Sequence, residues 1–427
     1  MKYVLVIGDG MADTALAELN GQTPLEALDL PAFDRVAGLR CGRVRTVPQG
    51  LAPGSDTAIL SIFGNDPRVC YTGRSVLEAE GMGVSLPEGG LSLRVNLCAV
   101  EMLNGQMVIH SHNGGNIHGD EAVALMNDLI AAPDFAAKMR EMGLTIHVTD
   151  SFRHIGVVMS AARDLTAVRL TEPHNVLEQP IAPYLPHMVA ETQDVAAKKL
   201  AEDIRELMLI SYDVLLDHPI NRRRIAQGQL PANLIWPWGA ATAMRLESFS
   251  EKYHKQGTVV SAVPLVWGIA RLGGLKTPHV EGANGDLDTN YQGKAERALQ
   301  ALFTEGDDFA AVHVEAPDEM AHAGSLEKKM LAIRRVNDLV VQPILDRLAE
   351  RGEPFRMLLL SDHPTLLTTR THDGAPVPYA LLDSRDAARE AADGKPAPAR
   401  KFCERTVANE PILEDGTALM AMLFEQA

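Results

Sequence analysis

Four short apolar runs, separated by segments with helical spacing, constrain the fold of this chain more than any other feature. The runs are residues 3–7, 258–263, 309–314 and 356–360. Strands that are buried on both faces of a parallel sheet have this continuous apolar character, and helices between them cover the two faces. The sequence therefore predicts an α/β fold with a mostly parallel sheet core and helices on both of its faces.

The middle of the chain has a different sequence pattern. Strand-like stretches recur there at residues 107–110, 144–148 and 155–159. Glycine and proline clusters flank this part of the sequence, as they commonly do where one domain gives way to another. We therefore expect a smaller α/β domain over 81–244, inserted into a larger domain formed by 1–80 and 245–427.

The composition of the 427-residue chain is that of an ordinary globular protein, with 46% hydrophobic and 22% charged residues. A formal net charge of −16 argues against nucleic acid or an anionic membrane surface as the main partner, because such partners select a basic face. A small anionic substrate fits this charge if metal ions or clustered arginines offset it locally.

The N-terminal run and the cysteines indicate the cellular compartment of the protein. The run at residues 3–7 is too short for a signal peptide, and no stretch reaches the roughly 18 to 20 apolar residues that a membrane span requires. Cys41, Cys70, Cys98 and Cys403 form no Cys-x-x-Cys pair. We therefore expect a reduced, cytoplasmic protein that does not enter a membrane.

Oxygen and nitrogen donors follow the ends of the predicted strands. Asp9 comes soon after the first run, and Asp362 and His363 follow the last. Asp318 and His322 follow the third run four positions apart, a spacing that lets both reach one ion from a turn of helix. Because the carboxyl ends of parallel strands share one edge of a sheet, we expect these side chains to meet there.

Ser55 and His372 extend this set of donors. Ser55 is expected at or near the N-cap of a helix over residues 57–63, where a metal and the helix N-terminus could stabilise an alkoxide and then a phosphate ester. Mixed Asp and His ligands suit Mn²⁺ or Zn²⁺ better than Ca²⁺, and two such ions can clamp a phosphoryl group. Singly, such residues are more often caps or ion-pair partners. Their order along the chain predicts a two-metal site for phosphoryl transfer.

Several motifs resemble those of a known family. They are Gly8-Asp9-Gly10-Met11, Thr23-Pro24-Leu25-Glu26-Ala27, Pro53-Gly54-Ser55-Asp56, Tyr71-Thr72-Gly73-Arg74-Ser75, Leu287-Asp288-Thr289-Asn290-Tyr291, Val314-Glu315-Ala316-Pro317-Asp318-Glu319 and Ser361-Asp362-His363-Pro364. In combination they are similar to the cofactor-independent phosphoglycerate mutases of the archaeal type, within the alkaline phosphatase superfamily. The resemblance implies an alkaline-phosphatase-like core and an inserted domain that closes as a lid over the substrate.

The resemblance also implies an activity, the interconversion of 3-phosphoglycerate and 2-phosphoglycerate in glycolysis and gluconeogenesis without bisphosphoglycerate. By motif position, Ser55 would carry the phosphoryl group as a phosphoserine intermediate. The resemblance divides the metal ligands into two sites, with Asp9, Ser55, Asp362 and His363 for one ion and Asp318, His322 and His372 for the other. We expect two divalent ions, with Mn²⁺ the first choice and Zn²⁺ or Mg²⁺ as alternatives.

A substrate that carries a phosphate and a carboxylate requires cations in the protein. The residues that qualify by type are His110, His112, Arg153, His154, Arg222, Arg223 and Lys294. His110 and His112 alternate along a predicted strand and should face the same side. Arg153 and His154 match a Tyr-Arg-His segment of the family, with Phe152 in place of the tyrosine. The oligomeric state has no signature in the sequence.

Two other interpretations stay open on the sequence alone. The same metal core could serve another phosphoryl transferase, such as a homoserine-kinase-like enzyme, or a phosphatase. A non-enzymatic scaffold could also keep the fold for binding, although every candidate donor is present. Substrate contacts in a closing lid would favour the mutase, and a water-accessible Ser55 would favour the others.

Overall fold

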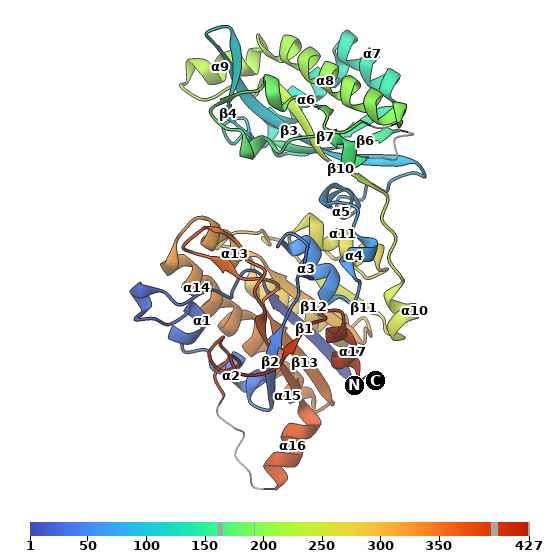
Figure 1. Cartoon of the computed structure of the whole chain (residues 1–427). Coiled ribbons are helices and arrows are strands. Elements are labelled where there is room, and N and C mark those ends of the chain that lie inside the picture. The colour runs from blue at the N-terminus through green and yellow to red at the C-terminus, as the bar shows by residue number, and fades with distance from the viewer. Residues whose placement is uncertain (161–164, 192, 394–399, 426–427) are drawn as a thin grey trace. The chain divides into compact units, whose positions relative to one another are not determined.

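The computed structural model describes residues 1–160, 165–191, 193–393 and 400–425. These residues form two compact units, unit 1 (Met1–Tyr71 and Arg245–Ala427) and unit 2 (Thr72–Met244) (Figure 1). The first division lies after Tyr71 and not after residue 80, because helix α5 (Arg74–Gly81) packs against strands of unit 2. The chain returns from unit 2 to unit 1 between Met244 and Arg245.

In the described residues, unit 1 is built on a sheet of seven strands. In spatial order they are β11 (Gly257–Val260), β12 (Phe309–Val314), β1 (Lys2–Gly8), β13 (Phe355–Leu360), β16 (Val377–Asp383), β2 (Arg40–Val44) and β17 (Ile412–Leu413). The first four are parallel, β16 is antiparallel to both of its neighbours, and β17 is parallel to β2. The four apolar runs are the four parallel strands, which confirms the predicted core.

Helices cover both faces of this sheet because successive side chains of a strand point to opposite sides (Figure 1). Val4 and Val6 of β1 belong to a core formed with α1 (Pro24–Ala27), α2 (Pro31–Ala37), α12 (Tyr291–Phe303), α14 (Leu326–Val336) and α15 (Gln342–Arg351). Tyr3 points to the other face, where its ring lies 4.9 Å from that of Phe424. The helices on that side are α3 (Ser55–Ile62), α10 (Phe249–Tyr253), α11 (Pro264–Leu272) and α17 (Ala418–Phe424).

Unit 2 is a separate α/β unit with its own core. Its long strand β3 (Gly90–Leu103) pairs with three antiparallel neighbours, β6 (Arg153–Met159), β10 (Leu234–Thr242) and β4 (Gln106–Ser111). The strands β5 (Leu144–His147) and β8 (Gln179–Pro180) continue this sheet. The helices that bury their apolar faces in its core are α6 (Asp120–Ala131), α7 (Pro133–Met142) and α8 (Val195–Leu215). The three predicted strand-like stretches are β4, β5 and β6.

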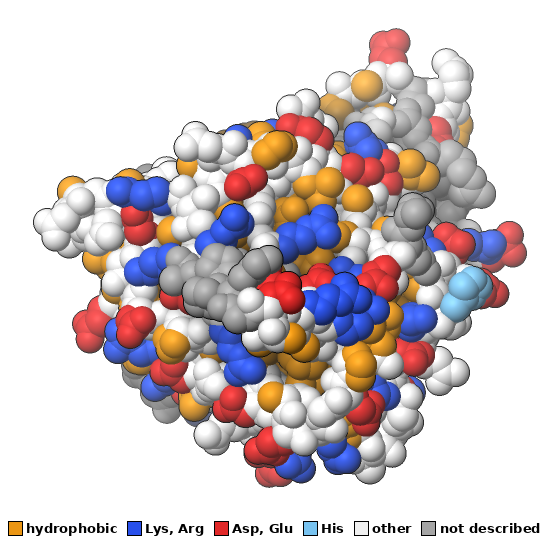
Figure 2. Space-filling model, turned by 90° about the horizontal axis from the view of Figure 1, so that it is seen from below, with side chains coloured by type: hydrophobic (Ala, Val, Ile, Leu, Met, Phe, Trp, Pro, Cys, Tyr) orange, Lys and Arg blue, Asp and Glu red, His pale blue; other side chains and the backbone are white. Residues whose placement is uncertain are grey.

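One face of the molecule carries charged side chains of both signs (Figure 2). Acidic and basic side chains are interspersed over the face that Figure 2 shows. A mixed surface of this kind is typical of a solvated face. Among the helices of the described residues, none combines the length and the apolar character that a bilayer crossing requires.

Candidate metal centre

The pairing of three parallel strands brings the predicted donors together at one edge of the unit 1 sheet. β1 pairs with β12 on one side and with β13 on the other. Asp9 follows β1, and Asp362 and His363 follow β13. Helix α13 (Ala316–His322) begins just after β12 and carries Asp318 at its start and His322 at its end. These strands therefore bring the side chains together at the carboxyl edge of the sheet.

The first cluster consists of Asp9, Asp362 and His363, which are all buried and whose nearest donor atoms lie within 4.8 Å of one another. Oδ1 of Asp9 and Oδ2 of Asp362 are buried and have no hydrogen-bond partner among the described residues. Burial, followed by the charge of Asp362, raises the pKa of Asp9 well above its usual range. Buried carboxylate oxygens without a donor are costly unless a cation satisfies them, so this donor set fits a divalent ion.

Ser55 lies beside this cluster. Its Oγ is 3.1 Å from Nε2 of His363 and 3.5 Å from Oδ2 of Asp9. Gly54 is the N-cap of α3, and Ser55 is the first residue of the helix, one position from the predicted cap. Free N–H groups and the helix dipole favour negative charge at this end, which suits a phosphate ester on Ser55.

The second cluster consists of Asp318, His322 and His372. Nε2 of His322 lies 3.2 Å from Oδ2 of Asp318 and 3.0 Å from Nε2 of His372. Nε2 of His372 lies 3.6 Å from Oδ1 of the same carboxylate. The structure thus groups the donors into the two sets that the resemblance implies, with a carboxylate in each.

The ring protons of the two histidines point away from this cluster. Nδ1 of His322 lies 2.9 Å from the carbonyl oxygen of Arg370, and Nδ1 of His372 lies 3.3 Å from that of Pro53. A carbonyl oxygen only accepts hydrogen bonds, so we assign both protons to Nδ1. The two Nε2 lone pairs then face each other, an arrangement that a proton or a cation must relieve. The hydrogen bond to Asp318 accordingly raises the pKa of His322 to about 9.

His313 is a member of the site that the sequence reasoning missed. It is buried on β12, with Nε2 3.0 Å from Oδ2 of Asp9 and Nδ1 3.2 Å from Oγ of Ser261. Nε2–H donates to the carboxylate and the Ser261 hydroxyl donates to Nδ1, which leaves Oδ1 of Asp9 for another partner. The available signal was a histidine inside an otherwise apolar run.

In unit 2, the predicted histidines lie in three different surroundings. His110 lies between Glu178, 3.0 Å from Nδ1, and Glu101, 3.4 Å from Nε2. His112 follows the end of β4, and its ring centroid is 6.1 Å from that of His174. His154 is buried, and its Nδ1 accepts a hydrogen bond from a backbone N–H. His110 and His112 therefore contact different groups.

Arg153 belongs to a cluster of guanidinium groups around the buried carboxylate of Glu78. Arg74 and Arg94 lie 2.9 and 3.0 Å from Glu78, and Arg153 lies 4.0 Å from it. Burial opposes ionisation of Glu78, but the positive charges outweigh burial and lower its pKa to about 2. The guanidinium of Arg94 also stacks over the ring of Trp238 at 4.2 Å. Three guanidinium groups thus surround one carboxylate, and the sequence reasoning missed Arg74 and Arg94.

The remaining predicted cations lie elsewhere. Arg222 and Arg223 are exposed on α9 (Pro219–Ala226) and pair with Asp217 at 3.4 Å and Glu121 at 2.7 Å. Lys294 lies on α12 of unit 1, is fully buried, and donates to the backbone carbonyl of His313 at 3.3 Å. Burial lowers the pKa of Lys294 to about 8. The contacts of these three residues are thus with groups other than Glu78.

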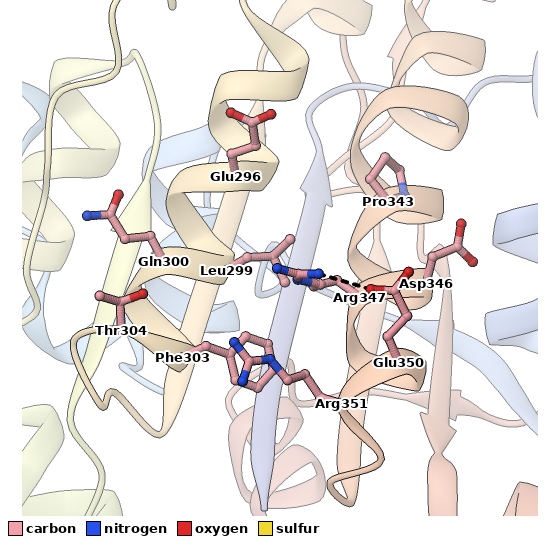
Figure 3. A pocket seen from close by; sticks show the side chains of 10 residues that line it. All are labelled: Glu296, Leu299, Gln300, Phe303, Thr304, Pro343, Asp346, Arg347, Glu350 and Arg351. Carbon is pink, nitrogen blue, oxygen red and sulfur yellow. Dashed lines mark hydrogen bonds and ion pairs between the residues drawn. The ribbon is translucent and has the colours of Figure 1, made fainter.

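A groove of ≈ 450 Å³ lies between α12 and α15 of unit 1 (Figure 3). Its walls include Phe303, Arg347 and Arg351 near the C-terminal ends of the two helices. Each of these helices ends just before the start of a strand, β12 or β13. The groove therefore lies toward the edge of the sheet opposite to the metal-ligand clusters and takes no part in their chemistry.

Comparison with known proteins identifies the family. Residues 38–221 match the family model described as 2,3-bisphosphoglycerate-independent phosphoglycerate mutase. A protein of Geobacter sulfurreducens named a probable 2,3-bisphosphoglycerate-independent phosphoglycerate mutase is 39% identical over 431 residues, with 100% of both chains covered. A protein of Methanosarcina acetivorans named 2,3-bisphosphoglycerate-independent phosphoglycerate mutase is 40% identical over 428 residues, and 100% of both chains is covered.

Solved structures share the fold. A protein from Pyrococcus horikoshii has a TM-score of 0.76 at 28% identity, covering 100% of this chain and 98% of its own. The cofactor-independent phosphoglycerate mutase from Thermoplasma acidophilum has a TM-score of 0.61 at 24% identity, covering 100% and 99%. Because curated relatives are 39% and 40% identical over the full length of both chains, the chain belongs to the family of 2,3-bisphosphoglycerate-independent phosphoglycerate mutases, which are isomerases.

Proposed function

We propose that this protein interconverts 3-phosphoglycerate and 2-phosphoglycerate without bisphosphoglycerate, through a phosphoserine on Ser55 beside two divalent ions. The observation that carries the proposal is the position of Ser55. Ser55 is the first residue of helix α3, and its hydroxyl oxygen lies 3.1 Å from Nε2 of His363 in the first donor cluster. A hydroxyl in such a place is suited to receive a phosphoryl group.

The two donor clusters would hold the ions. Asp9, Ser55, Asp362 and His363 would bind one, and Asp318, His322 and His372 the other. The unpartnered oxygens of Asp9 and Asp362 and the facing Nε2 atoms of the two histidines support this assignment. Mixed carboxylate and imidazole ligands favour Mn²⁺, with Zn²⁺ or Mg²⁺ as alternatives. When bound, two such cations would offset the negative charge that develops on the phosphoryl oxygens.

The reaction would proceed in two transfers at Ser55. In the first, Oγ attacks phosphorus, the bond from phosphorus to the C3 oxygen breaks, and that oxygen gains a proton. In the second, the C2 hydroxyl of the bound glycerate loses its proton and attacks phosphorus, the bond from phosphorus to Oγ breaks, and Oγ of Ser55 regains a proton. Oδ2 of Asp9, at 3.5 Å, is the carboxylate oxygen placed to take the proton of Ser55.

The Glu78 cluster supports an anionic substrate. Arg153, Arg94 and Arg74 would bind the carboxylate or phosphate of phosphoglycerate, because guanidinium groups hold such anions in a fixed, two-pronged geometry. Glu78 would keep the three arginines in place. Two exposed residues of the predicted set, Arg222 and Arg223, have acidic partners of their own and are secondary candidates.

A coupled assay tests the proposal. Metal-stripped protein receives 3-phosphoglycerate and Mn²⁺, without bisphosphoglycerate, while 2-phosphoglycerate and free phosphate are followed together. The proposal predicts metal-dependent 2-phosphoglycerate with little phosphate release, and no product from Ser55→Ala. Phosphate as the main product would indicate a phosphatase. No reaction would direct the search to other acceptors, beginning with homoserine.

A further inference from the structure

Thr365 connects the two donor clusters. It is fully buried, and it lies two positions after His363, at the start of the short strand β14 (Thr365–Leu366). Its hydroxyl donates a hydrogen bond to Oδ1 of Asp318 in the second cluster. The hydroxyl oxygen of Thr365 also lies 3.2 Å from Nδ1 of His363 in the first cluster. One hydroxyl group therefore contacts a donor residue from each set.

The chemistry of the three groups fixes the direction of these hydrogen bonds. A hydroxyl has one proton, and an ionised carboxylate only accepts, so the proton of Thr365 points to Asp318. The hydroxyl oxygen must then accept from Nδ1–H of His363. This tautomer leaves the lone pair of His363 on Nε2, the atom that faces Ser55 at 3.1 Å and Asp362 at 3.2 Å.

The surrounding backbone holds Thr365 in this position. Nζ of the fully buried Lys329 donates to the carbonyl oxygen of Thr365 at 2.7 Å and to Oδ2 of Asp13, also at 2.7 Å. The backbone N–H of Thr365 donates to the carbonyl oxygen of Ala12 at 3.2 Å. These contacts join the loop after β1 to the loop after β13, so the hydroxyl has a defined location relative to both clusters.

Gly10 shows how closely this region is packed. It has a φ of +60°, and a Cβ at this position would lie 2.6 Å from Oγ1 of Thr365 and 2.6 Å from Oδ1 of Asp318. Only glycine leaves room for the hydrogen bond between these two groups. A side chain at residue 10 would therefore displace Thr365 or Asp318 and break the hydrogen bond between them.

We propose that Thr365 is a positioning residue that sets the metal affinity of both clusters through one hydroxyl group. The inference rests on the proposed two-metal site. Removal of the hydroxyl takes one donor from Oδ1 of Asp318 and one acceptor from Nδ1–H of His363. Groups that orient metal ligands typically change metal affinity by about 10- to 100-fold, and here a single change affects two ions at once.

A matched set of variants tests this role. Thr365→Val keeps the shape and removes the hydroxyl, Thr365→Ser keeps the hydroxyl, and Thr368→Val changes an exposed threonine of the same loop. Mn²⁺ binding to the metal-stripped full-length proteins is measured by calorimetry and by electron paramagnetic resonance. We expect Thr365→Val to weaken both Mn²⁺ sites by about 10- to 100-fold, and the other two variants to bind both ions with nearly wild-type affinity.

The outcomes separate this inference from the proposed function. If Thr365→Val binds both ions as the wild type does, or weakens only one site, the inference is wrong and the two-metal site stands. If the wild type itself does not bind two Mn²⁺ ions, the proposed function fails and the inference fails with it. Failure of Thr365→Ser to restore both sites also overturns the role of the hydroxyl.

A second measurement does not depend on the folding of any Thr365 variant. Nitrogen-15 NMR of histidine-labelled wild-type protein, without metal, reports which ring nitrogen carries the proton, and His363→Gln assigns the signal. We expect His363 to carry its proton on Nδ1. A proton on Nε2 would contradict the hydrogen bond to Thr365 and overturn the inference.

Discussion

Nε2 of His322 lies 3.0 Å from Nε2 of His372, although a backbone carbonyl holds the proton of each ring on Nδ1. A proton or a cation must lie between two nitrogens at this separation, and a bound cation would have both of them as ligands. We therefore expect Mn²⁺ to stabilise the protein against heat. A ligand that binds only the folded state adds about 2.7 kcal/mol at a concentration 100 times its Kd.

The measurement is thermal unfolding of metal-stripped protein with and without Mn²⁺. His372→Ala should reduce the increase in Tm, because it removes one of the facing donors. His187→Ala, in unit 2, is a control that should leave the increase unchanged. An equal increase in Tm for wild type and His372→Ala would show that the ion binds elsewhere.

His313 should orient Asp9. Its Nε2–H occupies Oδ2 of the carboxylate at 3.0 Å, so that Oδ1 is free to bind an ion. His313→Leu should weaken one Mn²⁺ site by about 10- to 100-fold, and kcat should fall with it. His313→Gln offers an amide N–H in place of the ring donor and should recover part of the loss. Unchanged Mn²⁺ binding by His313→Leu would rule out this orienting role.

The Arg153 side chain should bind substrate. A hydrogen bond to a charged group contributes about 1.5 to 3 kcal/mol, so Arg153→Ala should lower kcat/KM for 3-phosphoglycerate by about 10- to 150-fold. Arg347→Ala is the matched control, because that side chain is exposed in unit 1 and pairs with Glu350 at 3.0 Å. Steady-state kinetics of both variants compares them directly. Equal effects of the two substitutions would remove the Glu78 cluster from the substrate site.

Glu78 makes the stability of unit 2 depend on acid pH. Its pKa is about 2 in the folded protein, against an ordinary value of 4.5. Since the folded value is the lower one, the ionised carboxylate stabilises the fold above pH 4.5, and this contribution is lost as the pH falls toward 2. The difference corresponds to about 3 kcal/mol.

Urea unfolding between pH 6 and pH 3 checks this dependence, with tryptophan fluorescence as the signal because Trp236 and Trp238 lie in unit 2. The wild type should be more stable than Glu78→Gln at pH 6, and the gap should shrink as the pH falls. A gap that stays constant with pH would mean that the ionisation of Glu78 does not stabilise the unit.

The strands of unit 1, and the meeting of polar residues at their carboxyl ends, could be predicted from the sequence for a physical reason. Strands buried on both faces must be continuously apolar, so a polar residue at their ends, such as Asp9 or Asp362, is conspicuous. The register of parallel strands then places such residues at one edge without further information. Ser55 was recognisable because a helix begins there.

The cations of unit 2 were less predictable. The group that organises them is the carboxylate of Glu78, and nothing in local sequence relates it to Arg94 or Arg153. Lys294 qualifies by type, but its helix buries it beneath the sheet edge, which only tertiary packing decides. His313 could not be recognised from the sequence, because a residue inside a buried strand is ordinarily assigned to the core.

The most direct test of the account is whether Ser55 carries the phosphoryl group during turnover. Enzyme loaded with Mn²⁺ is mixed with 3-phosphoglycerate, quenched in acid within one turnover, and digested for peptide mass spectrometry. The account predicts one added phosphoryl group on the peptide that contains Ser55, and none on that peptide from Ser55→Ala. Formation of 2-phosphoglycerate at the wild-type rate with no phosphate on Ser55 at any time point would contradict it.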